Sequence, residues 1–264
     1  MQIIKASMQQ AKSALKHKWH KVILVFCVVA AAFGMKALFV SLVSFIFSQG
    51  MSSLTVPLTA VISLLFIAFE LFCFCPLYIG AVRWLWQTVL GADEPFDTVF
   101  YYYETKADYK KAIEIGFNFL WRIYGYLILC SIPFTAMTMV RRLISGSLYF
   151  GIALKAGVFF GWILFAILGA VLFITLVSRH FLVLPVIFSD DNIDAFDAFR
   201  LSSIMSKGRV SSVMYMVLRF IPLFALCLLA VPIVWVVPYF VASVLSFAKS
   251  SIEEIKAAYR APQN

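Results

Sequence analysis

Three ionisable residues lie inside long apolar stretches, where their side chains could bind an ion or a solute. Glu70 is near the middle of the stretch 57–90, and Arg122 and Arg219 lie about 12 Å and about 15 Å along a helix from the nearest polar segment. Charged groups are costly inside a bilayer, so they usually pair or line a wet cavity. We therefore expect Glu70 to pair with Arg122 or Arg219. Such a pair is either a substrate or ion site or, in the interpretation that we favour, a structural salt bridge.

Motifs for enzymatic chemistry are absent from the sequence. It contains no H-E-x-x-H, no G-x-S-x-G and no phosphate-binding P-loop. His180 is the one histidine near the end of an apolar stretch, where a single histidine more often anchors a helix than binds a metal. All five cysteines lie inside apolar stretches, which predicts buried free thiols. We expect no catalytic residue, no metal and no cofactor.

The elements that position these residues are predicted from composition. Of the 264 residues, 63% are hydrophobic and 13% are charged, against about 45–50% and about 25% in a typical soluble protein. A soluble fold cannot bury that much apolar surface, so the excess must face lipid. The composition therefore predicts an all-α, polytopic transmembrane helical bundle.

The lengths of the apolar stretches predict about six spans. We place them within residues 22–47, 57–90, 112–140, 147–178 and 210–247, with two spans in the last stretch. Short interfacial amphipathic helices are expected within 91–111 and at about 193–207. The chain then consists of a basic leader (1–21), a single transmembrane domain (22–257) and a polar tail (258–264).

Prolines and glycines inside these stretches predict where the helices bend. Pro76 and Gly80 should kink the second span, because proline removes a helical hydrogen bond. Pro232 and Pro238 should bracket the turn between the last two spans.

The leader combines an apolar stripe with a basic one. The apolar residues recur every three or four positions and are Ile4, Met8, Ala11, Leu15 and Trp19. Lys5, Lys12 and Lys16 form a second stripe beside them. One interpretation is a helix in the cytoplasmic interface whose lysines contact anionic lipid headgroups. The other is a simple leader into the first span.

The distribution of basic residues predicts the orientation. The net charge is +9, and sixteen of the 22 Lys and Arg residues fall in the leader, around 83–111, around 179–209 and in the C-terminal segment. Six spans place all four segments on one side. Because cytoplasmic segments carry an excess of Lys and Arg, we expect both termini in the cytoplasm and the protein in the cell membrane.

A resemblance in the segment 179–209 also supports the class of multi-spanning membrane proteins. The residues that carry it are Pro185, Ile187, Asp190, Asp191, Ala195, Ala198, Ser202, Lys207 and Gly208. Their pattern resembles a bacterial family of uncharacterised multi-spanning membrane proteins, itself similar to the membrane domain attached to some glycerophosphodiester phosphodiesterases. The resemblance implies an all-helical membrane fold and supplies no catalytic residues.

Together these features predict a non-enzymatic integral membrane protein that interacts with lipid or acts as an accessory or scaffold subunit at the cytoplasmic leaflet. The expected partners are membrane lipid and a membrane protein. No nucleic-acid-binding motif is present, so no nucleic acid is expected. The alternative is a small-solute or ion transporter or channel that uses Glu70, Arg122 and Arg219.

Overall fold

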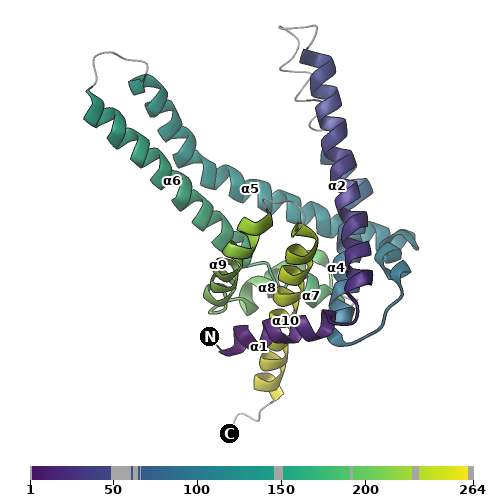
Figure 1. Ribbon diagram of the computed structural model, residues 1–264. Coiled ribbons are helices and arrows are strands. Elements are labelled where there is room, and N and C mark those ends of the chain that lie inside the picture. Colours follow the sequence, from purple (N-terminus) through teal and green to yellow (C-terminus); the bar gives the residue numbers. More distant parts are fainter. Residues whose placement is uncertain are drawn as a thin grey trace.

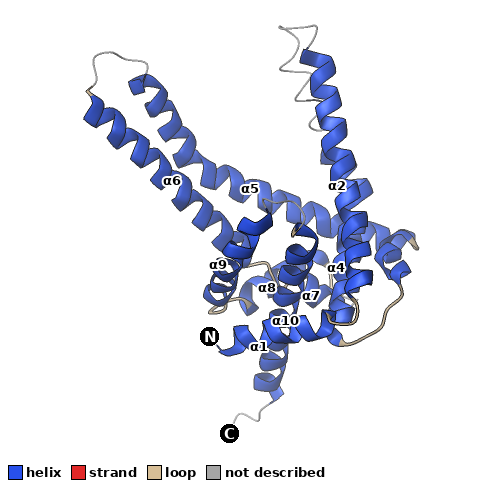
Figure 2. Ribbon diagram, in the orientation of Figure 1, coloured by secondary structure: helices blue, strands red, loops and turns tan. Residues whose placement is uncertain are grey.

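A computed structural model describes residues 2–48, 61, 65, 67–145, 151–190, 193–227 and 232–260 of the chain. The described part is 90% helical and contains no strand, as Figure 2 shows. Its elements are α1 (Gln2–Leu15), α2 (Trp19–Ser48), the π-helix η1 (Glu70–Phe74), α4 (Cys75–Leu90), the 3-10 helix η2 (Phe96–Tyr103), α5 (Lys106–Ser145), α6 (Ile152–Ser178), α7 (Val183–Ser189), α8 (Ala195–Met205), α9 (Val210–Leu226) and α10 (Ile233–Arg260). The predicted all-α class is confirmed.

Four helices in the described ranges are long and apolar enough to cross a membrane. They are Ile67–Leu90, Lys106–Ile144, Ala153–Ser189 and Ile233–Ile255. Two further pairs meet the same criterion together but bend sharply, by 96° between α1 and α2 and by 88° between α8 and α9. The described residues therefore contain four to six candidate spans, and the predicted six is the upper limit of that range.

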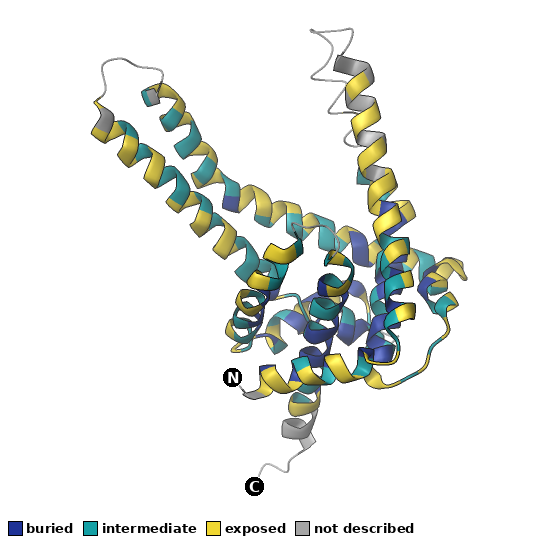
Figure 3. Ribbon diagram, in the orientation of Figure 1, coloured by how far each residue is buried: buried dark blue, intermediate teal, exposed yellow. Residues whose placement is uncertain are grey.

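The buried core lies at one end of the bundle. α2 and the α5–α6 hairpin project from it as two arms, while α1, α4, η2, α7, α8 and α10 gather at their base (Figure 1). Buried residues are concentrated in this base, and the arms are mostly exposed (Figure 3). The most apolar window of α6 contains no buried residue, whereas 44% of the corresponding window of α10 is buried. The apolar side chains of the arms therefore form the surface that lipid would cover.

α1 lies across the base and buries the stripe that the sequence predicts. Ile4, Ala11 and Leu15 are at most 4% exposed, because this face packs against α10 and α4. The Tyr239 hydroxyl of α10 also donates a hydrogen bond to the backbone carbonyl of Met8, at 3.4 Å. The stripe is thus covered by protein, which corrects the interpretation that it lies on lipid.

The second predicted span contains a π-helical turn just before Pro76. Glu70–Phe74 forms this turn, and Pro76 follows within the first two positions of α4. Gly80 has a different role from the one expected. It lies inside α4 where η2 crosses closely, and a Cβ there would overlap the carbonyl oxygen of Val99.

The C-terminal third follows the predicted order with two differences. The helix expected at about 193–207 is α8, which begins after Asp194, an extended residue at the N-cap position. The sequence did not predict α7, whose apolar side chains are largely buried in the base. Pro238 lies inside α10 and not at a turn. Asp191 and residues 261–264 of the predicted tail are outside the described residues.

Candidate functional site

Glu70 lies on the wall of a small cavity between η1, α4 and α5. The cavity has a volume of about 250 Å³, and its other lining residues include Cys75, Tyr78, Gly116 and Phe119. The lining is almost entirely apolar. The carboxylate is therefore the one formally charged group among the residues that line this cavity.

Arg122 belongs to an aromatic cluster at the end of α6. Its Nη1 donates hydrogen bonds to the backbone carbonyl and side-chain oxygen of Asn118, at 3.1 and 2.8 Å. The guanidinium carbon lies 4.0 Å from the centre of the Phe199 ring, which is a cation–π contact. The ring of His180 packs edge-on against the same phenylalanine and makes a 2.8 Å hydrogen bond with the Tyr126 hydroxyl.

Arg219 is placed elsewhere. It is exposed on α9, close enough to Tyr239 of α10 for its charge to act on that side chain. The described contacts of Arg122 and Arg219 do not include Glu70. The structure therefore does not bring the three predicted residues into one charge cluster.

The three lysines predicted to contact lipid share one side of α1. Lys5, Lys12 and Lys16 are all exposed. They lie beside the buried stripe, and docking of that stripe on α10 and α4 fixes the direction in which they project. The structure thus brings this predicted set together on one rigid surface.

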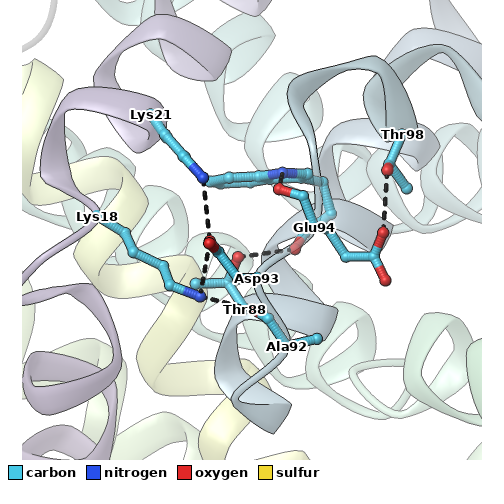
Figure 4. Close-up of polar contacts among 8 residues, drawn as sticks. Lys18, Lys21, Thr88, Ala92, Asp93, Glu94 and Thr98 are labelled. Atoms are coloured by element: carbon cyan, nitrogen blue, oxygen red, sulfur yellow. Dashed lines mark hydrogen bonds and ion pairs between the residues drawn. The ribbon is translucent and has the colours of Figure 1, made fainter.

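Two further lysines, Lys18 and Lys21, connect the corner between α1 and α2 to the loop 91–95. Figure 4 shows both side chains converging on Asp93, with Nζ to Oδ1 distances of 3.3 and 3.0 Å. Lys18 also donates to the carbonyl of Ala92 at 2.6 Å. Hydrogen bonds from Lys21 and Lys18 hold the pKa of Asp93 below its usual range. Sequence reasoning missed this contact, because 72 residues separate Lys21 from Asp93.

The loop itself is fixed by neighbouring side chains. The Trp84 indole N–H donates to the carbonyl of Glu94 at 3.3 Å, and the Thr98 hydroxyl donates to the Glu94 carboxylate at 3.2 Å (Figure 4). Gly91 ends α4 with φ +97°, a conformation that favours glycine. A fixed loop presents Asp93 to the two lysines in one geometry.

Aromatic residues of the helix expected within 91–111 attach η2 to α4. The guanidinium of Arg83 stacks 3.8 Å from the centre of the Tyr101 ring. The Tyr103 hydroxyl donates to the carbonyl of Cys73 at 2.5 Å. Partial burial raises the pKa of Tyr103 to about 12, so the phenol keeps its proton at neutral pH. The aromatic segment therefore serves packing within the protein.

The chemistry that this end of the molecule offers is anion binding. Among the described residues no three His, Cys, Asp or Glu side chains are grouped to hold a metal. The exposed lysines of α1 present several ammonium groups on one surface instead.

Comparison of the chain with known protein families, curated proteins and solved structures finds no match.

Proposed function

We propose that this chain is a non-enzymatic integral membrane protein that binds anionic phospholipid through α1 and acts as an accessory or scaffold subunit at the cytoplasmic leaflet. The observation that carries the proposal is the geometry of α1. Its apolar face is buried on the protein, and Lys5, Lys12 and Lys16 are exposed beside it. Each lysine near an anionic membrane surface contributes about 1 kcal/mol to binding.

The proposed orientation follows from where the basic segments gather. α1, the loop before η2, α8 and the C-terminal part of α10 lie at the base, and the C-terminal end of α5 and the N-terminal end of α6 lie at the opposite end (Figure 1). An excess of Lys and Arg marks the cytoplasmic side of membrane proteins. We therefore place the base at the inner leaflet of the cell membrane and both termini in the cytoplasm.

The proposed family placement rests on the pattern from Pro185 to Gly208. In the structure this pattern spans α7 and α8, which both pack in the base. A shared pattern in buried elements supports a shared fold and carries no activity. A lipid-binding or scaffolding role is in keeping with it.

Native mass spectrometry of the purified protein tests the lipid proposal. We expect the triple variant Lys5→Gln, Lys12→Gln, Lys16→Gln to retain markedly less phosphatidylglycerol than the unmodified chain, because three ammonium groups are lost. Retention of phosphatidylcholine should not change. The control is Arg142→Gln with Lys155→Gln, which removes two positive charges near the opposite end of the molecule.

Two results would contradict the proposal. One is equal phosphatidylglycerol retention by the triple variant and the unmodified chain. The other is an equal loss in the Arg142→Gln, Lys155→Gln control, because binding would then follow net charge and not α1. In-cell crosslinking from α1 tests the scaffold part, since a subunit should capture a membrane protein there.

One observation supports the transporter alternative. Glu70 lines a cavity in the span Ile67–Leu90, although neither arginine joins it there. If a solute passes along this cavity, Glu70→Gln should change its flux into proteoliposomes without changing lipid retention. If the triple lysine variant retained as much lipid as the unmodified chain and Glu70→Gln changed the solute flux, the transporter function would be better supported than the lipid-binding function.

A further inference from the structure

An apolar groove runs along the first span between three helices. α2, α4 and α10 enclose a volume of about 620 Å³ that is open on one side. Its lining includes Val22, Val29 and Phe33 of α2, Tyr78 and Ala81 of α4, and Val241 of α10. Ala30 and Phe33 of the α2 wall are exposed, so the groove opens to the surroundings of the bundle. We call this feature the α2–α4–α10 groove.

The length of the groove matches one leaflet. Its α2 wall extends from Val22 to Phe33, which is about 16 Å at 1.5 Å per residue. The hydrocarbon core of a bilayer is about 30 Å thick, so one leaflet is about 15 Å deep. An acyl chain that starts at the base would therefore follow the groove to its end.

A basic corner stands at the inner end of the groove. Residues 16–21, which comprise the junction 16–18 and the first turn of α2, are Lys, His, Lys, Trp, His and Lys, and Val22 is the first groove residue after them. Asp93 balances one charge of Lys18 and Lys21, and Lys16 is exposed. Trp84, which is buried, also lines the groove and donates its indole N–H to the carbonyl of Glu94 in the loop. The inner end is therefore suited to a phosphate and the rest to a hydrocarbon chain.

Tyr78 adds a polar group to the apolar wall. Its ring stacks on Phe33 with 4.8 Å between the ring centres. Its hydroxyl is buried and has no hydrogen-bond partner among the described residues. Phe33 is the last groove residue of α2, so Tyr78 closes the end of the groove that lies away from residues 16–21.

We propose that the α2–α4–α10 groove holds one acyl chain of an anionic phospholipid whose phosphate lies at the basic corner 16–21. This proposal rests on the proposed lipid-binding function and specifies where the lipid binds. The length of the groove, its apolar lining and the positive charge at its inner end all fit this occupant.

Photocrosslinking tests the groove directly. The full chain is reconstituted in vesicles that contain phosphatidylglycerol with a diazirine in its acyl chain, and labelled peptides are mapped by mass spectrometry. We expect labels on the groove faces of α2 and α10. Ala30→Phe places a ring in the groove and should lower that labelling severalfold.

Ala31→Phe is the matched control. Ala31 is exposed on the same helix and adjoins Ala30, but it does not line the groove. Equal labelling in Ala30→Phe and Ala31→Phe would overturn the groove while leaving α1-dependent lipid retention intact. A phosphatidylcholine probe that labels the groove as strongly as phosphatidylglycerol would overturn the role of the basic corner. Failure of the triple lysine variant to lose lipid would instead count against the proposed function alone.

Discussion

Gly80 determines at the scale of one residue how closely η2 can approach α4. A Cβ at this position would overlap the backbone carbonyl of Val99, which cannot move as a side chain can. We predict that Gly80→Ala destabilises the protein by about 1–3 kcal/mol, as overpacking usually does. Thermal unfolding of the purified protein in detergent measures the loss.

Gly125→Ala is the control for this prediction. Gly125 is also helical, but a Cβ there would have nothing within 4 Å. Alanine is the better helix former by about 1 kcal/mol, so this variant should unfold at the same or a higher temperature. Similar losses in both variants would show that contact with Val99 is not the cause.

The ion pairs of Asp93 with Lys18 and Lys21 predict that the stability of the protein depends on pH. Lys21 and Lys18 lower the pKa of the Asp93 carboxyl in the folded protein. The stabilisation by this carboxylate is therefore fully present above the ordinary carboxyl pKa of about 3.9. It is lost as the pH falls through the lower pKa of the folded state. Asp93→Asn should therefore unfold more easily than the unmodified chain at neutral pH. The two melting curves should converge below about pH 4. A constant difference down to the lowest pH would exclude this ion pair as the source.

At the scale of elements, docking of α1 depends on a small residue. Ala11 is fully buried where α1 meets the base, whereas Ala6 of the same helix is exposed. Ala11→Leu should destabilise the protein by about 1–3 kcal/mol through overpacking. Ala6→Leu should change stability by less than about 0.5 kcal/mol. Chemical unfolding followed by tryptophan fluorescence compares them, and a larger effect at Ala6 would contradict the described face of α1.

The sequence predicted the helices better than their surroundings. Run lengths located the candidate spans, and the helix expected at about 193–207 lies within two residues of α8, Ala195–Met205. The apolar stripe of α1 could be predicted, but the surface that buries it could not. Lipid and the apolar face of α10 both favour apolar residues at these positions. Periodicity alone cannot distinguish them.

The contacts of the candidate site residues were harder to predict. Arg122 contacts Phe199, which is on another helix and 77 residues away in the chain. The sequence of an apolar span does not determine which side chain an arginine contacts, because several aromatic or polar partners satisfy one guanidinium equally well. The expected pairing with Glu70 was one such choice. Lys5, Lys12 and Lys16 were predictable as a set because local helix geometry alone fixes their common side.

At the scale of the whole molecule, the order of spans predicts topology. α1 and the C-terminal part of α10 lie at the same end (Figure 1), and six crossings require this. Reporter fusions at the C-terminus and at Ser52, which is outside the described residues, should therefore report opposite sides of the membrane. The same side for both would contradict six spans. A reporter at the tip of the α5–α6 hairpin should agree with Ser52.

The contact between Tyr239 and Met8 joins residues 231 positions apart. During synthesis α1 emerges first, and its partner α10 emerges last. At roughly 5–20 residues per second the interval is tens of seconds. Throughout it the part of the apolar face of α1 that packs on α10 lacks this partner, although α4 is already made. We therefore expect α1 to reach its final contacts with α10 only after synthesis of the last helix.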